Sequence, residues 1–299
     1  MKINTNIKGY FFVLVATLAM SNVYIFSKAA LKEIDISKFG FYWFGFALFW
    51  NIIFIIYTKK NIIFDFKENL KILIILGFFE IISTSFFFLA INFFVNPALV
   101  SFLTNIGPVF VTILSIIFLK EKFNKIEIIG AIITILGAFI INYKNGSIFP
   151  KEIFWGLIFV LGSKIISSIS TIITKKNIVN IPPVIFSINR TIYLFVFSFV
   201  VLLITSNGFE ISKDVLLNIG LGSLLGPFLA AIAGYTALKY IDASKSSILG
   251  SSKGVFVLIT AYLYFDMLPL TYQIIGGLLT IIGIILITYG KLKIKKAKS

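Results

Sequence analysis

The sequence contains no cysteine and no histidine, and acidic residues are few. The lack of these two residue types excludes disulfide bonds, thiolate nucleophiles, imidazole bases and the usual zinc ligands in this chain. Only 12 Asp and Glu stand against 27 Lys and Arg, and charged residues make up 13% of the 299 residues. A group that exchanges protons must therefore be a carboxylate, a lysine or a tyrosine, and no metal or cofactor is expected.

The hydrophobic content is correspondingly high. Hydrophobic residues account for 59% of the chain and the mean hydropathy is +1.02, compared with roughly 45–50% apolar residues in soluble domains. The basic residues lie in short groups between apolar runs and do not form one stripe, so a nucleic-acid partner is not expected. Their positions favour loops that face anionic lipid, which makes the lipid bilayer the expected partner.

Apolar runs of about 20 residues, the length that crosses a bilayer, recur along the whole chain. The sequence predicts an all-α integral membrane protein with ten transmembrane helices, near residues 9–29, 37–57, 71–91, 97–119, 126–143, 153–173, 184–205, 215–238, 244–264 and 272–290. The first run follows Lys2 and Lys8, as in a signal peptide, but it is too long for one.

Loop lysines predict the orientation, because cytoplasmic loops carry an excess of basic residues. If the N-terminus is cytoplasmic, 18 lysines lie in segments on the cytoplasmic side of the membrane. Six fall outside, namely Lys28, Lys32, Lys38, Lys144, Lys151 and Lys213. We therefore expect a multi-pass protein of the cell membrane with both termini in the cytoplasm.

The two halves of the chain are similar to each other, with matching residues about 147 positions apart. The pairs are Gly9 and Gly156, Phe12 and Phe159, Ser21 and Ser168, Lys28 and Lys175, then Gly130 and Gly276, Gly137 and Gly283 at an offset of 146. We divide the chain into repeats 1–146 and 147–299. Five spans are an odd number, so the repeats are inverted, which is the organisation of many secondary transporters.

One segment of the first repeat carries a resemblance to a known family. From residue 97 to 141 it reads PALVSFLTNIGPVFVTILSIIFLKEKFNKIEIIGAIITILGAFII. It contains small residues at the start, a proline at 108, Leu-x-Glu at Leu119 to Glu121, and then a glycine-bearing helix. This pattern resembles the EamA-type carriers of the drug/metabolite transporter superfamily.

The second copy of the pattern, residues 242–287, departs from it. Gly254 stands at the proline position, and Met267, beside Asp266, stands at the glutamate position. The resemblance covers essentially the whole chain and implies that helices one, three, four, six, eight and nine line a central cavity.

Charged residues inside spans are candidates for function because lipid disfavours them. Glu80, Lys164 and Lys253 are predicted at similar depth on cavity helices, and Arg190 near the cytoplasmic end of the seventh span. Two interpretations stay open. These residues bind an anionic or zwitterionic solute, or Glu80 forms a structural ion pair with one of the two lysines.

Other residues complete the candidate site. Asn22 and Asn105 are polar candidates for substrate binding on the first and fourth spans. Pro108 and Pro227 interrupt the fourth and eighth spans and are candidate gating residues, since proline removes a helix hydrogen bond. Glu80 is the one carboxylate predicted midway along a span, and we expect it to exchange the proton in a coupled transport cycle.

The sequence favours a secondary transporter for a small organic metabolite, with amino acids or related zwitterions as the leading substrates. An alternative is a membrane scaffold that does not transport, and a Ser-Lys hydrolase built on Ser252 and Lys253, or on Lys164 and Ser168, is a remote one. No Walker motif is present, so nucleotide-driven transport is not expected. A homodimer remains open.

Overall fold

The computed structural model of the chain describes residues 5–58, 65–94, 100–101, 103–140, 151–205, 208–266 and 270–297. The regular elements in these ranges are all helical. They are α1 (Thr5–Leu31), α2 (Ile36–Thr58), α3 (Phe66–Phe93), η1 (Thr104–Ile106), α5 (Gly107–Leu119), α6 (Lys125–Ile140), α7 (Lys151–Asn177), α8 (Pro183–Thr205), α9 (Lys213–Ser223), η2 (Leu224–Ala230), α10 (Ala231–Tyr240), α11 (Ala243–Gly250), α12 (Lys253–Phe265) and α13 (Thr271–Ala297).

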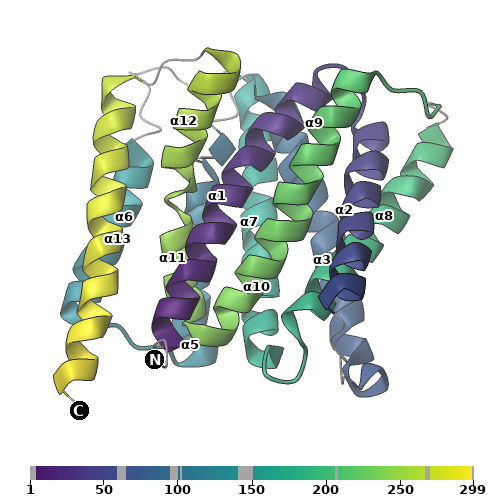
Figure 1. Cartoon of the computed structure of the whole chain (residues 1–299). Helices are drawn as coiled ribbons and strands as arrows, with labels where there is room; N and C mark the ends of the chain where they lie inside the picture. Colours follow the sequence, from purple (N-terminus) through teal and green to yellow (C-terminus); the bar gives the residue numbers. More distant parts are fainter. Residues whose placement is uncertain are drawn as a thin grey trace.

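Each predicted span corresponds to one of these helices or to consecutive ones. The fourth span is η1 with α5, the eighth is α9 with η2 and α10, and the ninth is α11 with α12. Residues 97–99 and 141–143, at the ends of two predicted spans, lie outside the described residues. The prediction of ten helices in two five-helix repeats is therefore confirmed, and Figure 1 shows both marked chain ends on the same side of the bundle.

The outer faces of the helices have the composition that lipid requires. Seven helical stretches are long and apolar enough to cross a membrane, and shorter apolar helices span Thr104–Leu119 and Ile274–Ile287. Large apolar side chains such as Ile56, Leu203 and Leu263 are exposed on them. Exposed apolar surface of this extent is expected of a membrane protein and not of a soluble monomer. The chain is a multi-pass membrane protein.

The two repeats interlock instead of standing side by side. In the packing of the bundle α1 lies against α10, α3 against α7, α2 against α8, and α6 against α13, so each pair joins one repeat to the other. The α6 and α13 pair stands at one edge of the bundle (Figure 1). A Cβ at Gly130 would lie 2.7 Å from the carbonyl oxygen of Gly283, and one at Gly137 would lie 2.6 Å from that of Gly276.

These glycines explain the close packing of the pair. Small residues let two helix backbones approach within membranes, where association depends on packing. Gly130 and Gly276 are repeat counterparts, as are Gly137 and Gly283, so the contact is made twice about a pseudo-twofold axis. Any larger residue would push the helices apart.

The repeat relationship extends to the irregular backbone. Lys120 and Asp266 both adopt left-handed backbone geometry, with φ of 56° and 55°, and they are 146 residues apart. The 3-10 turn of η1 at 104–106 corresponds, at the same offset of 146, to residues 250–252, where the chain breaks between α11 and α12 at Ser251 and Ser252. The fourth helix of each repeat is thus interrupted at the same place.

Two lysines at equivalent positions cap helix ends. Lys28, at the end of α1, donates from Nζ to the carbonyl oxygens of Ile91 (3.1 Å) and Asn92 (3.3 Å) at the end of α3. Its counterpart Lys175, at the end of α7, donates to the carbonyl oxygens of Leu238 (2.6 Å) and Ile241 (2.8 Å) at the end of α10. The last carbonyls of a helix lack donors within the helix, and a cation there also complements the helix dipole.

This arrangement corrects one expectation from the sequence. Lys28 was predicted in an outside loop, but its exposed fraction is 7% and it points into the protein. A lysine that caps a helix has to be counted with the packed interior, not with the loop charges that set orientation. Lys175, counted inside, caps a helix in the same way, so the remaining asymmetry of 17 against five still favours a cytoplasmic N-terminus.

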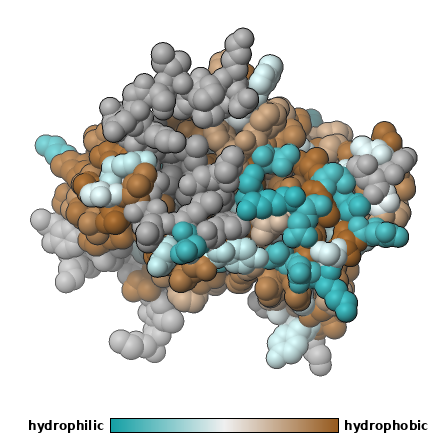
Figure 2. Space-filling view, turned by 90° about the horizontal axis from the view of Figure 1, so that it is seen from above, coloured by the Kyte–Doolittle hydropathy of each residue, from teal (hydrophilic) through white to brown (hydrophobic). Residues whose placement is uncertain are grey.

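An aromatic core closes the end of the bundle opposite the chain termini. Tyr24, Phe39, Trp43 and Phe88 are buried there, with ring centroids of Phe39 and Trp43 4.9 Å apart and of Phe39 and Phe88 also 4.9 Å apart. Figure 2 views this end from above and shows hydrophilic side chains gathered on one part of it. Lys38, in the first turn of α2, donates from Nζ to the Glu210 carbonyl at 3.0 Å, which ties the start of α2 to the α8–α9 connection.

Replacing either capping lysine by methionine should destabilise the fold. Both Lys28→Met and Lys175→Met leave two helix-end carbonyls without their donor, and a hydrogen bond to a charged group contributes about 1.5–3 kcal/mol. Thermal melting of the purified variants in detergent measures the effect. Lys67→Met, an exposed change in the first turn of α3, is the control and should melt like the wild type. Unchanged melting of both capping variants would contradict the role assigned to them.

Candidate functional site

A hollow lies between the aromatic core and the end of the bundle that carries the termini. It has two neighbouring lobes with volumes of about 320 and 280 Å³. The first, here called the paired lobe, contains Glu80 and Tyr235, and the second, here called the cationic lobe, contains Lys253 and Thr104. Lys164 and Arg190 line both lobes, so the two form one site.

The helices that the family resemblance implied do line the hollow. Side chains come from α1, α3, α5, α7, η2, α10, α11 and α12, which belong to spans one, three, four, six, eight and nine. Two further helices contribute. Trp43 and Phe44 enter from α2 and Arg190 enters from α8.

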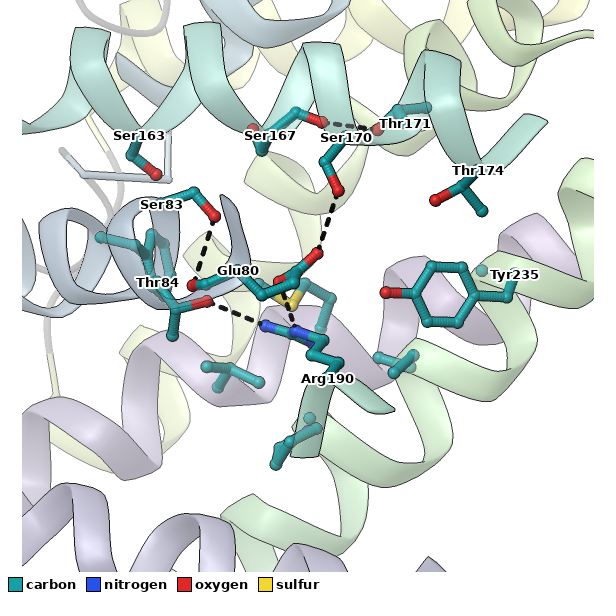
Figure 3. A pocket seen from close by; sticks show the side chains of 18 of the residues that line it. Glu80, Ser83, Thr84, Ser163, Ser167, Ser170, Thr171, Thr174, Arg190 and Tyr235 are labelled. Atoms are coloured by element: carbon teal, nitrogen blue, oxygen red, sulfur yellow. Dashed lines mark hydrogen bonds and ion pairs between the residues drawn. The ribbon is translucent and has the colours of Figure 1, made fainter. Parts of the chain in front are cut away.

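The paired lobe is organised by an ion pair between α3 and α8. Arg190 donates from Nε to Glu80 Oε2 at 2.7 Å, and its guanidinium lies 3.4 Å from the Thr84 hydroxyl. Ser170 of α7 donates to the other Glu80 oxygen at 3.4 Å. Figure 3 shows these side chains converging from three helices on the carboxylate. Glu80 is held in place by partners from α7 and α8.

The partner of Glu80 differs from the one expected. One of the two interpretations left open by the sequence pairs Glu80 with Lys164 or Lys253, but the carboxylate contacts Arg190. Arg190 was expected near the cytoplasmic interface, where a long side chain reaches water. Its side chain turns inward instead and is 24% exposed, because the α3 carboxylate offers a partner at that level.

Lys164 and Lys253 are the cations of the cationic lobe. Lys164 lies on α7 with its Nζ 5.4 Å from the centroid of the Phe87 ring. It passes close to Gly107, where a Cβ would lie 3.1 Å from Lys164 Cδ. Lys253, the first residue of α12, places its Nζ 3.4 Å from Asn105 Oδ1. Among the described residues neither lysine has a carboxylate within 4.0 Å.

The two predicted asparagines have different surroundings. Asn105 is 4% exposed, and its Nδ2 is buried with no partner among the described residues. This amide therefore has a free donor beside Lys253. Asn22 donates from Nδ2 to the Leu18 carbonyl of its own helix at 2.9 Å, and the residues that line the two lobes do not include it.

The candidate gating prolines both border the hollow. Pro108 lines the cationic lobe and stands in the first turn of α5, directly after the 3-10 turn of η1. Pro227 lines the paired lobe inside η2, which is a π-helical segment. The predicted breaks are therefore real irregularities of the backbone, and each faces the site.

A row of hydroxyl groups on α7 was not singled out as a set from the sequence. Ser163, Ser167, Ser170, Thr171 and Thr174 all line the paired lobe. Their spacing of three or four residues puts them on one face of a helix. That spacing is the signal in the sequence that would have identified this polar face, although hydrogen bonding between helices could account for each residue taken alone.

The geometry also bears on the remote hydrolase alternative. The Ser168 hydroxyl donates to the Lys164 carbonyl at 2.6 Å, and the Ser252 hydroxyl donates to the Leu249 carbonyl at 2.8 Å. In both cases the serine proton is directed to the helix backbone and not to a lysine amine, so the arrangement lacks the base contact that activates a nucleophile.

The fold and the site together define a class, a helical membrane protein with a polar hollow between inverted repeats. Comparison with known proteins identifies the family. The model of the EamA-like transporter family matches residues 7–143 and 154–289, and the chain belongs to this family. The two matched ranges fall on the two sequence repeats.

Individual relatives agree with this assignment. A protein of Synechocystis described as an uncharacterized transporter is 28% identical over 218 residues, which cover 68% of this chain and 61% of that protein. A crystal structure superimposes on the chain with a TM-score of 0.78 at 14% identity, covering 97% of this chain and 99% of the other. At that identity the likeness establishes the fold.

A double-mutant cycle will test the ion pair between Glu80 and Arg190. Removing one partner leaves a charge of low exposure without its counter-ion, and we expect Arg190→Gln to lower the free energy of unfolding by about 3–5 kcal/mol. The double variant Glu80→Gln with Arg190→Gln should recover part of this loss. If the loss of stability in the double variant equals the sum of the losses in the two single variants, the two side chains do not stabilise each other.

Proposed function

We propose that this protein is a secondary carrier that moves a small organic metabolite across the cell membrane by alternating access, with amino acids and related zwitterions as the leading substrates. The observation that carries the proposal is the hollow between the inverted repeats, where Glu80, Lys164, Arg190 and Lys253 meet inside the membrane-spanning bundle. Intramembrane charges of this kind mark substrate and ion pathways. We place both termini in the cytoplasm.

The backbone breaks support a moving site. In transporters with inverted repeats, interrupted helices border a binding site near the middle of the membrane. Here η1, η2 and the break at Ser251 and Ser252 all adjoin the hollow. A scaffold that does not transport has no need of a polar hollow, which favours the carrier over that alternative.

We further propose that Glu80 couples transport to protons. Substrate that competes for Arg190 would release the carboxylate, which then takes up a proton. The pairing with Arg190, not with a lysine, makes the guanidinium the group that substrate must engage.

Flux in proteoliposomes tests both proposals. The wild-type protein should accumulate its substrate when a pH gradient is imposed, and exchange it without one. Glu80→Gln keeps the shape and cannot release a proton, so it should exchange substrate but lose the gradient dependence. Glu68→Gln, an exposed change on the same helix, is the control. A folded Glu80→Gln variant that still responds to the gradient would show that this carboxylate is structural, and no flux of any small solute would refute the carrier.

Pro108 and Pro227 are proposed as hinges. Replacing either with alanine restores a backbone donor in a helix that is interrupted beside the site. We expect Pro108→Ala and Pro227→Ala to change the maximal transport rate several-fold and the substrate concentration for half-maximal rate much less. Rates equal to wild type in both folded variants would argue against the hinges.

A further inference from the structure

The hollow has an excess of positive charge. Three cations line it, Arg190, Lys164 and Lys253, against the single carboxylate of Glu80. Glu80 is already paired with Arg190 at 2.7 Å. The residues that line the cationic lobe include no Asp or Glu. The described residues therefore leave the two lysines without a counter-ion.

The internal repeat indicates that these charges do not belong to the shared scaffold. At an offset of 147, Lys164 corresponds to Thr17, Arg190 to Trp43 and Glu80 to Pro227. At an offset of 146, Lys253 corresponds to Gly107. All four counterparts also line the hollow, namely Thr17, Trp43, Gly107 and Pro227.

The capping lysines behave in the opposite way. Lys28 and Lys175 are both lysine and make the same contact in each repeat. The capping lysine is thus present twice, whereas each charge in the hollow is present once. None of these four charges has a charged counterpart in the other repeat, so the charge pattern of the hollow does not follow the pseudo-twofold symmetry of the fold.

Buried charge without a counter-ion is costly, and an anion in the lobe would offset the cost for both lysines. Asn105 does not line the lobe, but its Oδ1 accepts from Lys253 Nζ at 3.4 Å and so helps to position that ammonium group. Two ammonium groups in a lobe lined by no acidic residue match the oxygens of a carboxylate or of a similar oxyanion.

We propose that the cationic lobe binds the anionic group of the substrate, and that the protein prefers small organic solutes with a net negative charge, such as acidic amino acids and dicarboxylates. This inference rests on the carrier function proposed above and narrows its substrate class. Neutral zwitterions would leave one lysine without a counter-ion, and cations would be repelled.

Thermal stabilisation by added solutes tests the preference, because a ligand that binds the folded state raises its melting temperature by mass action. The probes are glutamate, succinate, glutamine, lysine and glycerol phosphate, each at the same ionic strength. Glutamate and succinate should stabilise the wild-type protein most and lysine least. Glycerol phosphate separates a site for carboxylates from one that accepts any oxyanion. If glutamine or lysine stabilises the protein most, the inference is wrong.

Substitutions then locate the site. Lys164→Met and Lys253→Met should each weaken glutamate or succinate binding about tenfold to hundredfold, the range expected for one charged hydrogen bond. Lys253→Arg should retain most of the affinity. Lys67→Met, far from the hollow on the exposed first turn of α3, should bind like the wild type.

The melting temperature without solute separates this role from a structural one. Removing an unpaired buried cation should leave the stability of Lys164→Met and Lys253→Met unchanged or raise it, whereas loss of a structural lysine lowers it. Lower stability of both variants with unaltered solute binding would overturn the inference. If the protein transports neutral amino acids and anions have no effect, the preference for anionic substrates is wrong, but the carrier function stands. Absence of binding and flux for every probe would refute both.

Discussion

Within a membrane, a backbone group at a helix end must find its partner inside the protein, because hydrocarbon offers none. Several buried charges of this chain meet that need. Lys28 and Lys175 donate to the last carbonyls of α3 and α10. Glu121, after α5, accepts the first amides of α11, at 2.7 Å from Ala243 N and 3.1 Å from Ser244 N. These contacts allow helices to end or break where the site requires it.

The same constraint separates two kinds of buried charge. Charges of the first kind cap the backbone at helix ends, and the lysine cap recurs in both repeats. In the hollow, Glu80 and Arg190 pair with each other, whereas Lys164 and Lys253 have no carboxylate within 4.0 Å among the described residues. A carrier needs both kinds, since the first makes the interrupted fold stable and the second leaves interactions that a solute completes.

Packing divides the bundle into a fixed part and a part that borders the site. The α6 and α13 pair is held by glycine contacts that leave no room for a larger side chain. The helices around the hollow contain the 3-10 turn, the π segment and the break between α11 and α12. A closely packed edge that joins both repeats, combined with irregular helices around a polar hollow, is consistent with rearrangement about a central site.

The sequence by itself determined the spans, the repeat and the family. Hydropathy is a property of local composition, so ten apolar runs predicted the helices to within a few residues of their ends, apart from the stretches outside the described residues. The glycines that match between the repeats, Gly130 with Gly276 and Gly137 with Gly283, are the residues at the close contact of α6 and α13.

Only the tertiary structure decided which charges meet. A residue's depth follows from its position in a span, but the direction of its side chain depends on the rotation of each helix, which packing sets. For that reason Arg190 and not a lysine pairs with Glu80, Lys28 turns inward to cap α3, and Asn22 bonds to its own helix. These contacts join residues far apart in the chain, and no local pattern encodes them.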